Sequence, residues 1–289
     1  MIIGHKEIID QLKNLADSQS LFHGYIFFGP NRIGKKTVAL SLANYLENKV
    51  FDKPKKILSD FFEINSNKIN DANTEKQSAL EEIKVIKNFL WQSPNISSYR
   101  VVLIDNAENL NQYAQNALLK ISEEPQKHSL IILICRDPEL LLPTLSSRFQ
   151  KIYFGLVGDK EIEKWLISEF KIKKEEAEKI AKNSFGLPGV SYALLKDEIF
   201  QKNINNAKMF LKLKGKERIN FIKKLIDEAK EKGDFDIDSY LETLMFVLKE
   251  VNKNNMELWK RILKLRMDFR FYNLNSKLQL VALSQFLEK

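Results

Sequence analysis

Apolar residues in the first half of the chain gather into short runs separated by stretches with helical spacing. Two runs, Val101–Ile104 and Leu130–Ile134, are continuously apolar, which is typical of strands buried on both faces of a parallel sheet. The runs Tyr25–Phe28 and Phe61–Ile64 are also predicted to be strands. Between the two continuous runs, apolar side chains recur at helical spacing, at Ala114, Ala117, Leu118 and Ile121. This alternation predicts an α/β domain with a mostly parallel sheet.

After Phe154 the pattern becomes helical and stays helical to the end of the chain. We expect three parts, an α/β domain at residues 1–155, a small helical lid at 156–197 and an all-helical domain at 198–289. The apolar stripes of the last part are interpreted as the core of a helical bundle, because a bundle needs them to fold. Turn-like breaks are predicted at residues 186–189 and 233–238.

Composition limits the class of protein. The chain has 289 residues, of which 44% are hydrophobic and 29% charged, close to ordinary globular usage. Its longest unbroken apolar run, Leu130–Cys135, is far too short to span a bilayer. Glu7 interrupts the N-terminus before a signal-peptide apolar region could form. We therefore expect a cytoplasmic protein without a membrane partner.

Cysteine and histidine usage argues against disulfides and metal clusters. Cys135 is the only cysteine of the chain, so no internal disulfide can form. The three histidines, His5, His23 and His128, are scattered rather than spaced as metal ligands. No zinc is expected.

The positive charge of the chain is unevenly distributed. The net charge is +8, and residues 201–289 carry 19 basic against 12 acidic side chains, a net of +7. A basic region attracts nucleic acid. Exposed lysines on helices are also ordinary solubilising surface, so both readings stay open at this point.

The clearest chemical motif follows the first predicted strand. The run Gly29–Lys35, with Pro30 and Gly34 inside it, matches the first seven positions of a P-loop and precedes a helical stretch. In such a loop the backbone N–H groups and the lysine bind phosphate oxygens, so ATP is the candidate cofactor. The alternative is a glycine-rich turn that holds no ligand.

The eighth position of the motif departs from the pattern. Lys36 stands where a Ser or Thr hydroxyl would bind Mg²⁺, and the hydroxyl arrives one residue late at Thr37. One residue on a helix is a rotation of about 100°, so Thr37 does not replace the missing ligand without rearrangement. Magnesium-dependent chemistry and the binding of ATP are both left in question.

An aspartate ends the third predicted strand. Asp105 would lie beside the P-loop, where a Walker B carboxylate holds Mg²⁺, or it would only cap the segment that follows. ATPases of the additional-strand class usually place a glutamate at the next position to polarise the attacking water. Here that position is Asn106, whose amide cannot act as a general base.

Several further motifs together carry a family resemblance. Asn116–Pro125, Asp137-Pro138 and Leu142–Arg148 resemble segments of the AAA+ subunits of the bacterial DNA polymerase III clamp loader, as do Ile3–His5 and His23–Phe27. The matches cover about residues 1–195. The resemblance implies an AAA+ α/β domain, a helical lid and an all-helical collar domain that holds a ring together.

Within that family, the departures resemble the delta prime type rather than the gamma/tau motor. Lys36 and Asn106 replace motor residues, Cys135-Arg136 stands near sensor 1, and the segment Gly186–Val190 offers no sensor 2 arginine. Many members carry a four-cysteine zinc module after the P-loop helix, and residues 46–61 contain no cysteine. We expect a helical or irregular segment there instead.

Arg148 is the one catalytic residue that the resemblance implies. It falls in Ser147-Arg148-Phe149, which is similar to the family's Ser-Arg-Cys motif. The arginine of that motif reaches the ATP of a neighbouring motor subunit and stabilises the charge on its γ-phosphate. The alternative is a surface arginine that closes a turn.

The resemblance implies a delta prime-type ring subunit that helps load the sliding clamp onto primed DNA. Its expected partners are the gamma/tau and delta subunits, the clamp and the DNA, with little or no ATPase activity of its own. Two alternatives stay open. One is an ATPase motor of the gamma/tau type, and the other is a nucleic-acid-binding scaffold whose P-loop is vestigial.

Overall fold

The computed structural model describes residues 2–66, 75–231, 237–251, 256–271 and 274–287. Packing divides the chain into two compact units, Met1–Ser191 and Tyr192–Lys289. The predicted three-part division into α/β domain, lid and collar stays a prediction.

Five parallel strands form the sheet of the first unit, in the order β2-β3-β4-β1-β5. Their bounds are Gly24–Phe28 for β1, Phe61–Asn65 for β2, Arg100–Asp105 for β3, Ser129–Cys135 for β4 and Gln150–Tyr153 for β5. Because parallel strands share one carboxyl edge, the loops after β1, β3 and β4 leave the sheet next to one another. This edge carries the P-loop.

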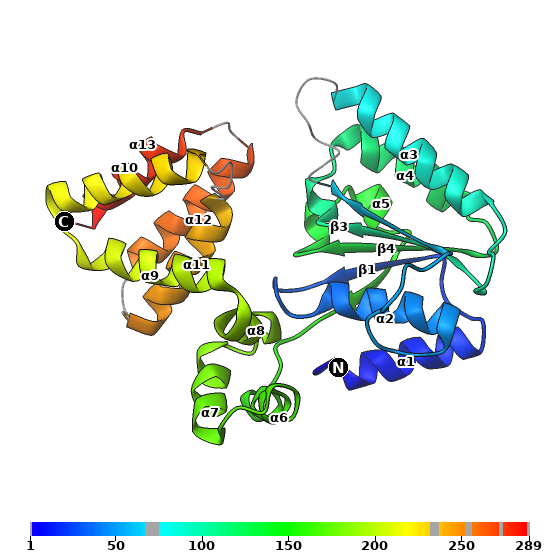
Figure 1. The fold of residues 1–289 in the computed structure, drawn as a ribbon. Helices are drawn as coiled ribbons and strands as arrows, with labels where there is room; N and C mark the ends of the chain where they lie inside the picture. The colour runs from blue at the N-terminus through cyan, green and yellow to red at the C-terminus, as the bar shows by residue number, and fades with distance from the viewer. Residues whose placement is uncertain (1, 67–74, 232–236, 252–255, 272–273, 288–289) are drawn as a thin grey trace. The chain divides into compact units, whose positions relative to one another are not determined.

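Helices cover both faces of the sheet (Figure 1). The helices α1, Lys6–Asp17, and α2, Lys35–Asn48, lie on one side, and α3, Glu75–Trp91, and α4, Gln112–Glu123, on the other. Strand side chains alternate between these faces, so one buried cluster joins alternate residues of β3 and β4 to α3 and α4. The predicted α/β fold with a parallel sheet is confirmed.

Short and lid-region elements complete the first unit. They are the 3₁₀ helices η2, Ala107–Asn109, and η3, Pro138–Leu140, and the helices α5, Pro143–Ser146, α6, Asp159–Phe170, and α7, Lys174–Asn183. The helix α8, Pro188–Lys196, runs from the first unit into the second. Of the break predicted at 186–189, the turn at Gly186 has a φ of 77°, while Pro188 already begins α8.

The strand β5 is the one strand that the hydrophobic pattern does not predict. It pairs with β1, at the end of the sheet order, with Tyr25 opposite Gln150. Gln150 and Lys151 are exposed. An edge strand of this kind needs no continuous apolar run, so its sequence carries little signal.

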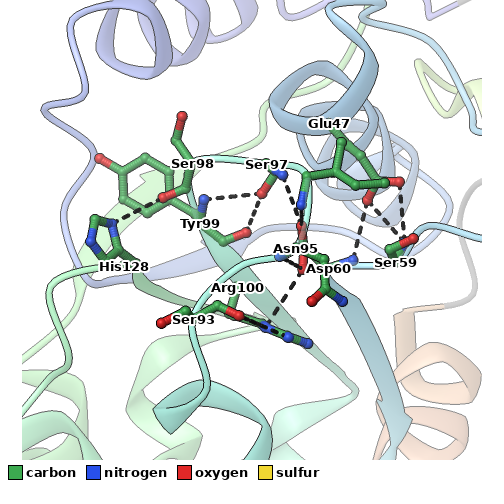
Figure 2. Close-up of polar contacts among 11 residues, drawn as sticks. Glu47, Ser59, Asp60, Ser93, Asn95, Ser97, Ser98, Tyr99, Arg100 and His128 are labelled. Carbon is green, nitrogen blue, oxygen red and sulfur yellow. Dashed lines mark hydrogen bonds and ion pairs between the residues drawn. The ribbon is translucent and has the colours of Figure 1, made fainter.

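The segment after α2 is irregular from residue 49 to residue 60, which is one of the two forms expected there. The carboxylate of Glu47 accepts the backbone N–H groups of Ser59, at 3.0 Å, and Asp60, at 3.2 Å (Figure 2). The amide of Asn44 donates to the carbonyls of Val50, at 3.0 Å, and Asp52, at 2.9 Å. Side chains of α2 thus stabilise this segment through its backbone.

Asp60 ties the same segment to the entry of β3. Its carboxylate accepts the backbone N–H groups of Asn95, Ile96 and Ser97 at 2.7 to 2.8 Å and pairs with the Arg100 guanidinium at 3.5 Å (Figure 2). Burial by itself raises the pKa of Asp60, but the three N–H donors and Arg100 outweigh it, and the pKa lies below its ordinary value.

The second unit is helical throughout its described residues. Its helices are α9, Glu198–Lys212, α10, Gly215–Glu231, α11, Ile237–Val251, α12, Met256–Phe271, and α13, Ser276–Phe286. The buried Arg218 of α10 donates to the carbonyls of Phe210, at 3.0 Å, and Ser284, at 2.9 Å, and so joins α9 and α13. The predicted apolar stripes are buried, as Ile222, Leu244 and Ile262 illustrate.

The second predicted break, at 233–238, lies mostly outside the described residues, and α11 begins at Ile237. Across the ranges that the structure describes, no helix combines the length and the apolar character that a membrane span requires.

Candidate functional site

The P-loop connects β1 to α2, as the motif predicts. Gly29, Arg32 and Gly34 have φ values of 134°, 61° and 113°. A Cβ at position 29 would lie 2.4 Å from the Phe154 carbonyl oxygen, so only glycine fits there. A Cβ at position 34, by contrast, would meet no atom within 4 Å, which leaves open space at the start of α2.

Lys35 points into its own loop. Its Nζ donates to the carbonyl oxygens of Gly29, at 2.6 Å, and Pro30, at 2.7 Å. The side chain is buried, and burial lowers its pKa to about 8, although the nearby Glu108 carboxylate opposes the shift. The ammonium that a phosphate would attract is therefore bonded to the backbone of the loop.

Lys36 reaches the two carboxylates at the edge of the sheet. Its Nζ lies 2.5 Å from Glu63 Oε1 on β2 and 3.2 Å from Asp105 Oδ2 at the end of β3. Burial alone lowers the pKa of Lys36, but the hydrogen bond to Glu63 and the charge of Asp105 outweigh it and raise the pKa. Lys36, at the position where the P-loop pattern has a hydroxyl, thus binds Asp105, the candidate Walker B residue, directly.

Thr37 follows Lys36 in the first turn of α2. Its carbonyl accepts the Ser41 hydroxyl at 2.8 Å, a side-chain bond back to the carbonyl four residues earlier. Asp105 also accepts the N–H of Asn106, at 3.1 Å, just before η2. The structure therefore brings Lys36 and Asp105 together, and Asp105 additionally contacts the segment that follows it.

Arg136 anchors the loop from the end of β4. Its Nε donates to Asn31 Oδ1 at 3.1 Å and lies 3.7 Å from Glu108 Oε1, and its carbonyl accepts the Gly29 N–H at 3.2 Å. The Glu108 side chain is buried. In the sequence, Arg136 departs from the motor-type pattern near sensor 1. In the structure, it contacts the P-loop itself.

Two further segments hold the middle of the P-loop. The N–H of Gly189, at the start of α8, donates to the Arg32 carbonyl at 2.8 Å, and a Cβ at position 189 would meet that oxygen at 2.8 Å. His5 Nε2 lies 3.3 Å from the Ile33 carbonyl. The loop is thus fixed by residues from both ends of the first unit.

These contacts fit the two ligands of an ordinary P-loop, a polyphosphate and Mg²⁺, differently. The open space beside Gly34 and the positive φ values fit a polyphosphate, which Gly29, Pro30, Gly34 and Lys35 would contact. They do not fit Mg²⁺, because the Lys36 ammonium already lies within 3.2 Å of the oxygen that would bind it.

Arg148 lies in a different region, just after α5. Its Nη1 donates to the Thr144 carbonyl at 2.6 Å and its Nη2 to Glu123 Oε1 at 2.9 Å. The next residue, Phe149, is buried against Gly24, where a Cβ would approach its ring to 2.5 Å. Phe149 therefore fixes the backbone while the guanidinium stays at the surface.

The described residues hold no group of three or more His, Cys, Asp or Glu side chains that could bind a metal ion. Cys135 is buried at the end of β4, and burial raises the pKa of its thiol to about 12. A thiol of this kind is neither a ready nucleophile nor a ready ligand at neutral pH.

Sequence reasoning missed three acidic partners of these cations. Glu63 contacts Lys36, Glu108 lies near Lys35, and Glu123 contacts Arg148. Glu63 gave the clearest signal, because it is the single acid in the strand Phe61–Asn65. The other two lie in helical segments, where an acidic residue is ordinary.

Known proteins resemble this chain over most of its length. The tau subunit of DNA polymerase III from Bacillus subtilis is 26% identical over 260 residues, which cover 86% of this chain and 46% of the relative. The replication factor C small subunit of Methanococcus vannielii is 26% identical over 241 residues, 79% of this chain and 70% of the relative. The matched residues span between about a quarter and about half of the length of the polymerase III relatives.

Solved structures share the fold. A gamma subunit-related protein of DNA polymerase III from Thermotoga maritima has a TM-score of 0.57 and 22% identity, covering 96% of this chain and 98% of that one. A model of the family described as DNA polymerase III, delta subunit, matches residues 4–157, more than half of the chain. The chain therefore belongs to the DNA polymerase III, delta subunit family of bacterial clamp-loader AAA+ proteins.

Proposed function

We propose that the chain is a delta prime-type subunit of the DNA polymerase III clamp loader. It acts in a ring with gamma/tau and delta subunits, helps load the sliding clamp onto primed DNA, and leaves ATP hydrolysis to its neighbours. Family membership supports the clamp-loader role. The finer assignment rests on how the chain uses its own cations.

The observation that carries the proposal is the contrast between Lys36 and Arg148. Lys36 binds Asp105, so the Walker B carboxylate already has a cation from its own chain. Arg148 lies at the surface, where its guanidinium donates to Glu123 and to a carbonyl of its own turn. The subunit thus retains the residue that acts on a neighbour and has altered the residues that act on its own nucleotide.

Arg148 has the chemistry for a role in trans. A guanidinium offers planar, bidentate N–H donors that match phosphate oxygens and stays charged at every physiological pH. Its exposed ion pair with Glu123 is worth at most about 1 kcal/mol, so a phosphate can replace the carboxylate at little cost. In GTPases an arginine supplied in this way raises the rate by roughly 10³ to 10⁵.

The P-loop is proposed as a structural nucleotide site. Gly29, Pro30, Gly34, Lys35 and Thr37 would surround the phosphates of any ATP that the subunit retains. Asn106 offers no base to activate water, so a retained nucleotide would not turn over. The competing proposal is a gamma/tau-type motor, which the presence of Lys35 and Asp105 favours.

The experiment reconstitutes the loader with this chain and measures ATP hydrolysis in the presence of clamp and primed DNA. Arg148→Ala should lower turnover at the adjoining site by roughly 10³-fold, and Arg148→Lys should restore little of it. Lys35→Ala should change the rate less than about twofold, because the proposed subunit catalyses no hydrolysis itself.

Lys151→Ala, at an exposed position of β5, is the matched control and should behave as wild type. Size-exclusion chromatography of each ring separates a failure to assemble from a failure to catalyse. An unchanged rate with Arg148→Ala would end the trans role. Loss of turnover with Lys35→Ala, or turnover by the isolated chain, would instead identify a motor.

A further inference from the structure

Lys36 joins two strands at the carboxyl edge of the sheet. Glu63 lies on β2 and Asp105 on β3, and the register pairs Glu63 with Leu103, two residues before Asp105. The Lys36 ammonium lies 2.5 Å from one carboxylate and 3.2 Å from the other. One cation from the first turn of α2 therefore serves two anions from neighbouring strands.

The two carboxylates need a cation between them. Two negative charges that converge on one point repel each other, and partial burial strengthens the repulsion. In P-loop proteins a hydroxyl at this helix position and a carboxylate at this strand end share a divalent cation. Here the hydroxyl is absent, and an ammonium group occupies the place between helix and strand.

Mg²⁺ and this ammonium cannot share the place. Magnesium keeps a tight octahedral shell of oxygen ligands at about 2.1 Å, and it is commonly held by one or two carboxylates with water. Lys36 offers no lone pair, adds a like charge and already occupies Asp105 Oδ2 and Glu63 Oε1. Mg²⁺ would have to displace a hydrogen-bonded cation before it could bind.

We propose that Lys36 is a built-in substitute for the divalent cation of this P-loop, which holds Glu63 and Asp105 together and excludes Mg²⁺ from the edge of the sheet. The inference does not depend on the trans role of Arg148. Its test uses the isolated chain and a metal ion, so its failure can be told apart from a failure of the proposed function.

The test measures the midpoint of thermal unfolding in EDTA and in millimolar Mg²⁺ or Mn²⁺. The wild type should show the same midpoint in all three conditions. Lys36→Met removes the charge and keeps most of the side-chain volume, so its midpoint should fall in EDTA. Added Mg²⁺ or Mn²⁺ should restore about 3 °C or more, because the released carboxylates now bind the metal.

Lys182→Met is the matched control. Lys182 is an exposed lysine paired with one carboxylate, Glu178, at 2.8 Å, and its loss should create no response to metal. A wild-type chain stabilised by Mg²⁺ would overturn the proposal. A Lys36→Met chain whose midpoint ignores both metals would overturn it too, because the carboxylates would then form no latent metal site.

A second measurement keeps the proposal testable if Lys36→Met does not fold. Electron paramagnetic resonance measures the concentration of free Mn²⁺. The wild-type chain and the Asp105→Asn variant should leave the same amount of Mn²⁺ free. A stoichiometric loss of free Mn²⁺ with the wild type that disappears in Asp105→Asn would overturn the proposal. The same unfolding experiment can be repeated with ATP. Mg²⁺ should not enlarge any shift of the wild-type midpoint that ATP causes, and an enlarged shift would also overturn the proposal.

Discussion

Two arginines of the first unit have the same kinds of partner in opposite surroundings. Arg100 pairs with Asp60 and donates to the Ser93 carbonyl at 2.9 Å, and its side chain is 6% exposed against 1% for Asp60. Arg148 pairs with Glu123 and donates to the Thr144 carbonyl, with side chains 36% and 47% exposed. Each arginine thus binds one carboxylate and one carbonyl, and the two pairs differ in that the first is buried and the second is exposed to solvent.

The difference has an energetic consequence. A buried pair that loses one member leaves an uncompensated charge without water, whereas an exposed pair is replaced by water at little cost. The same reasoning applies to Lys35 and Arg148. Lys35 is buried and bonded to carbonyls of its loop, whereas Arg148, the arginine proposed to act in trans, is exposed.

Removing the buried carboxylate should have the largest effect. Asp60→Ala should lower the free energy of unfolding by about 3 to 5 kcal/mol, because Arg100 and three backbone N–H groups lose their acceptor. Glu123→Ala, the exposed counterpart, should change it by less than about 1 kcal/mol. Urea denaturation measures both, and equal losses would contradict the comparison.

Lys35 should make stability depend on alkaline pH. Its pKa is about 8 in the folded chain and 10.5 when unfolded, so between these values the unfolded chain holds more protons and stability rises with pH. The gain is at most about 3 kcal/mol. Lys35→Met should abolish this rise. The difference in unfolding free energy between wild type and variant should therefore widen from pH 8 to pH 10.5. A constant gap would mean that Lys35 is not buried as described.

Asp60 should make stability depend on acidic pH, and here too stability should rise with pH. Its folded pKa is lowered, so its contribution is complete above the ordinary value of 3.8 and is lost as pH falls through the lower folded pKa. The gap in unfolding free energy between wild type and Asp60→Asn should therefore shrink below pH 4. A gap that stays the same down to pH 2 would show that protonation of Asp60 does not matter.

Releasing Arg148 should have the smallest effect. Glu123→Gln removes the charge that holds the guanidinium at 2.9 Å and keeps the side-chain shape. In a reconstituted loader it should raise ATP turnover by about twofold, since an exposed ion pair of a few tenths of a kcal/mol no longer competes with phosphate. Glu124→Gln, next in the chain, is the control. Slower turnover would mean that Glu123 positions Arg148 rather than restrains it.

The sequence was informative where a pattern repeats over several residues. The continuous apolar runs located β3 and β4, and the stripes around Ile222 and Ile262 located helices of the second unit. The strand β5 was not predicted, because an exposed edge strand buries few side chains and so needs no continuous apolar run. The P-loop was recognised because glycines, lysine and flanking elements must all occur in order.

The sequence did not predict which residues contact the site residues. Lys36 was identified as standing in place of a hydroxyl, and the structure adds that it binds Glu63, 27 positions away on β2. Gly189 was assigned to a turn, and the structure adds that its N–H bonds the Arg32 carbonyl. No local rule links such pairs, because their separation along the chain does not specify which side chains converge.

The sequence by itself determined the fold class, the P-loop and the family, since each depends on short-range order and residue type. Only the tertiary structure decided which charges are satisfied within the chain. Lys36 and Arg100 meet their partners through the sheet order and the register of β2 on β3. Lys35 bonds carbonyls of its own loop, while Arg148 meets Glu123 at the surface. The free energy of a charge depends on its burial and its neighbours, and both are properties of the folded chain.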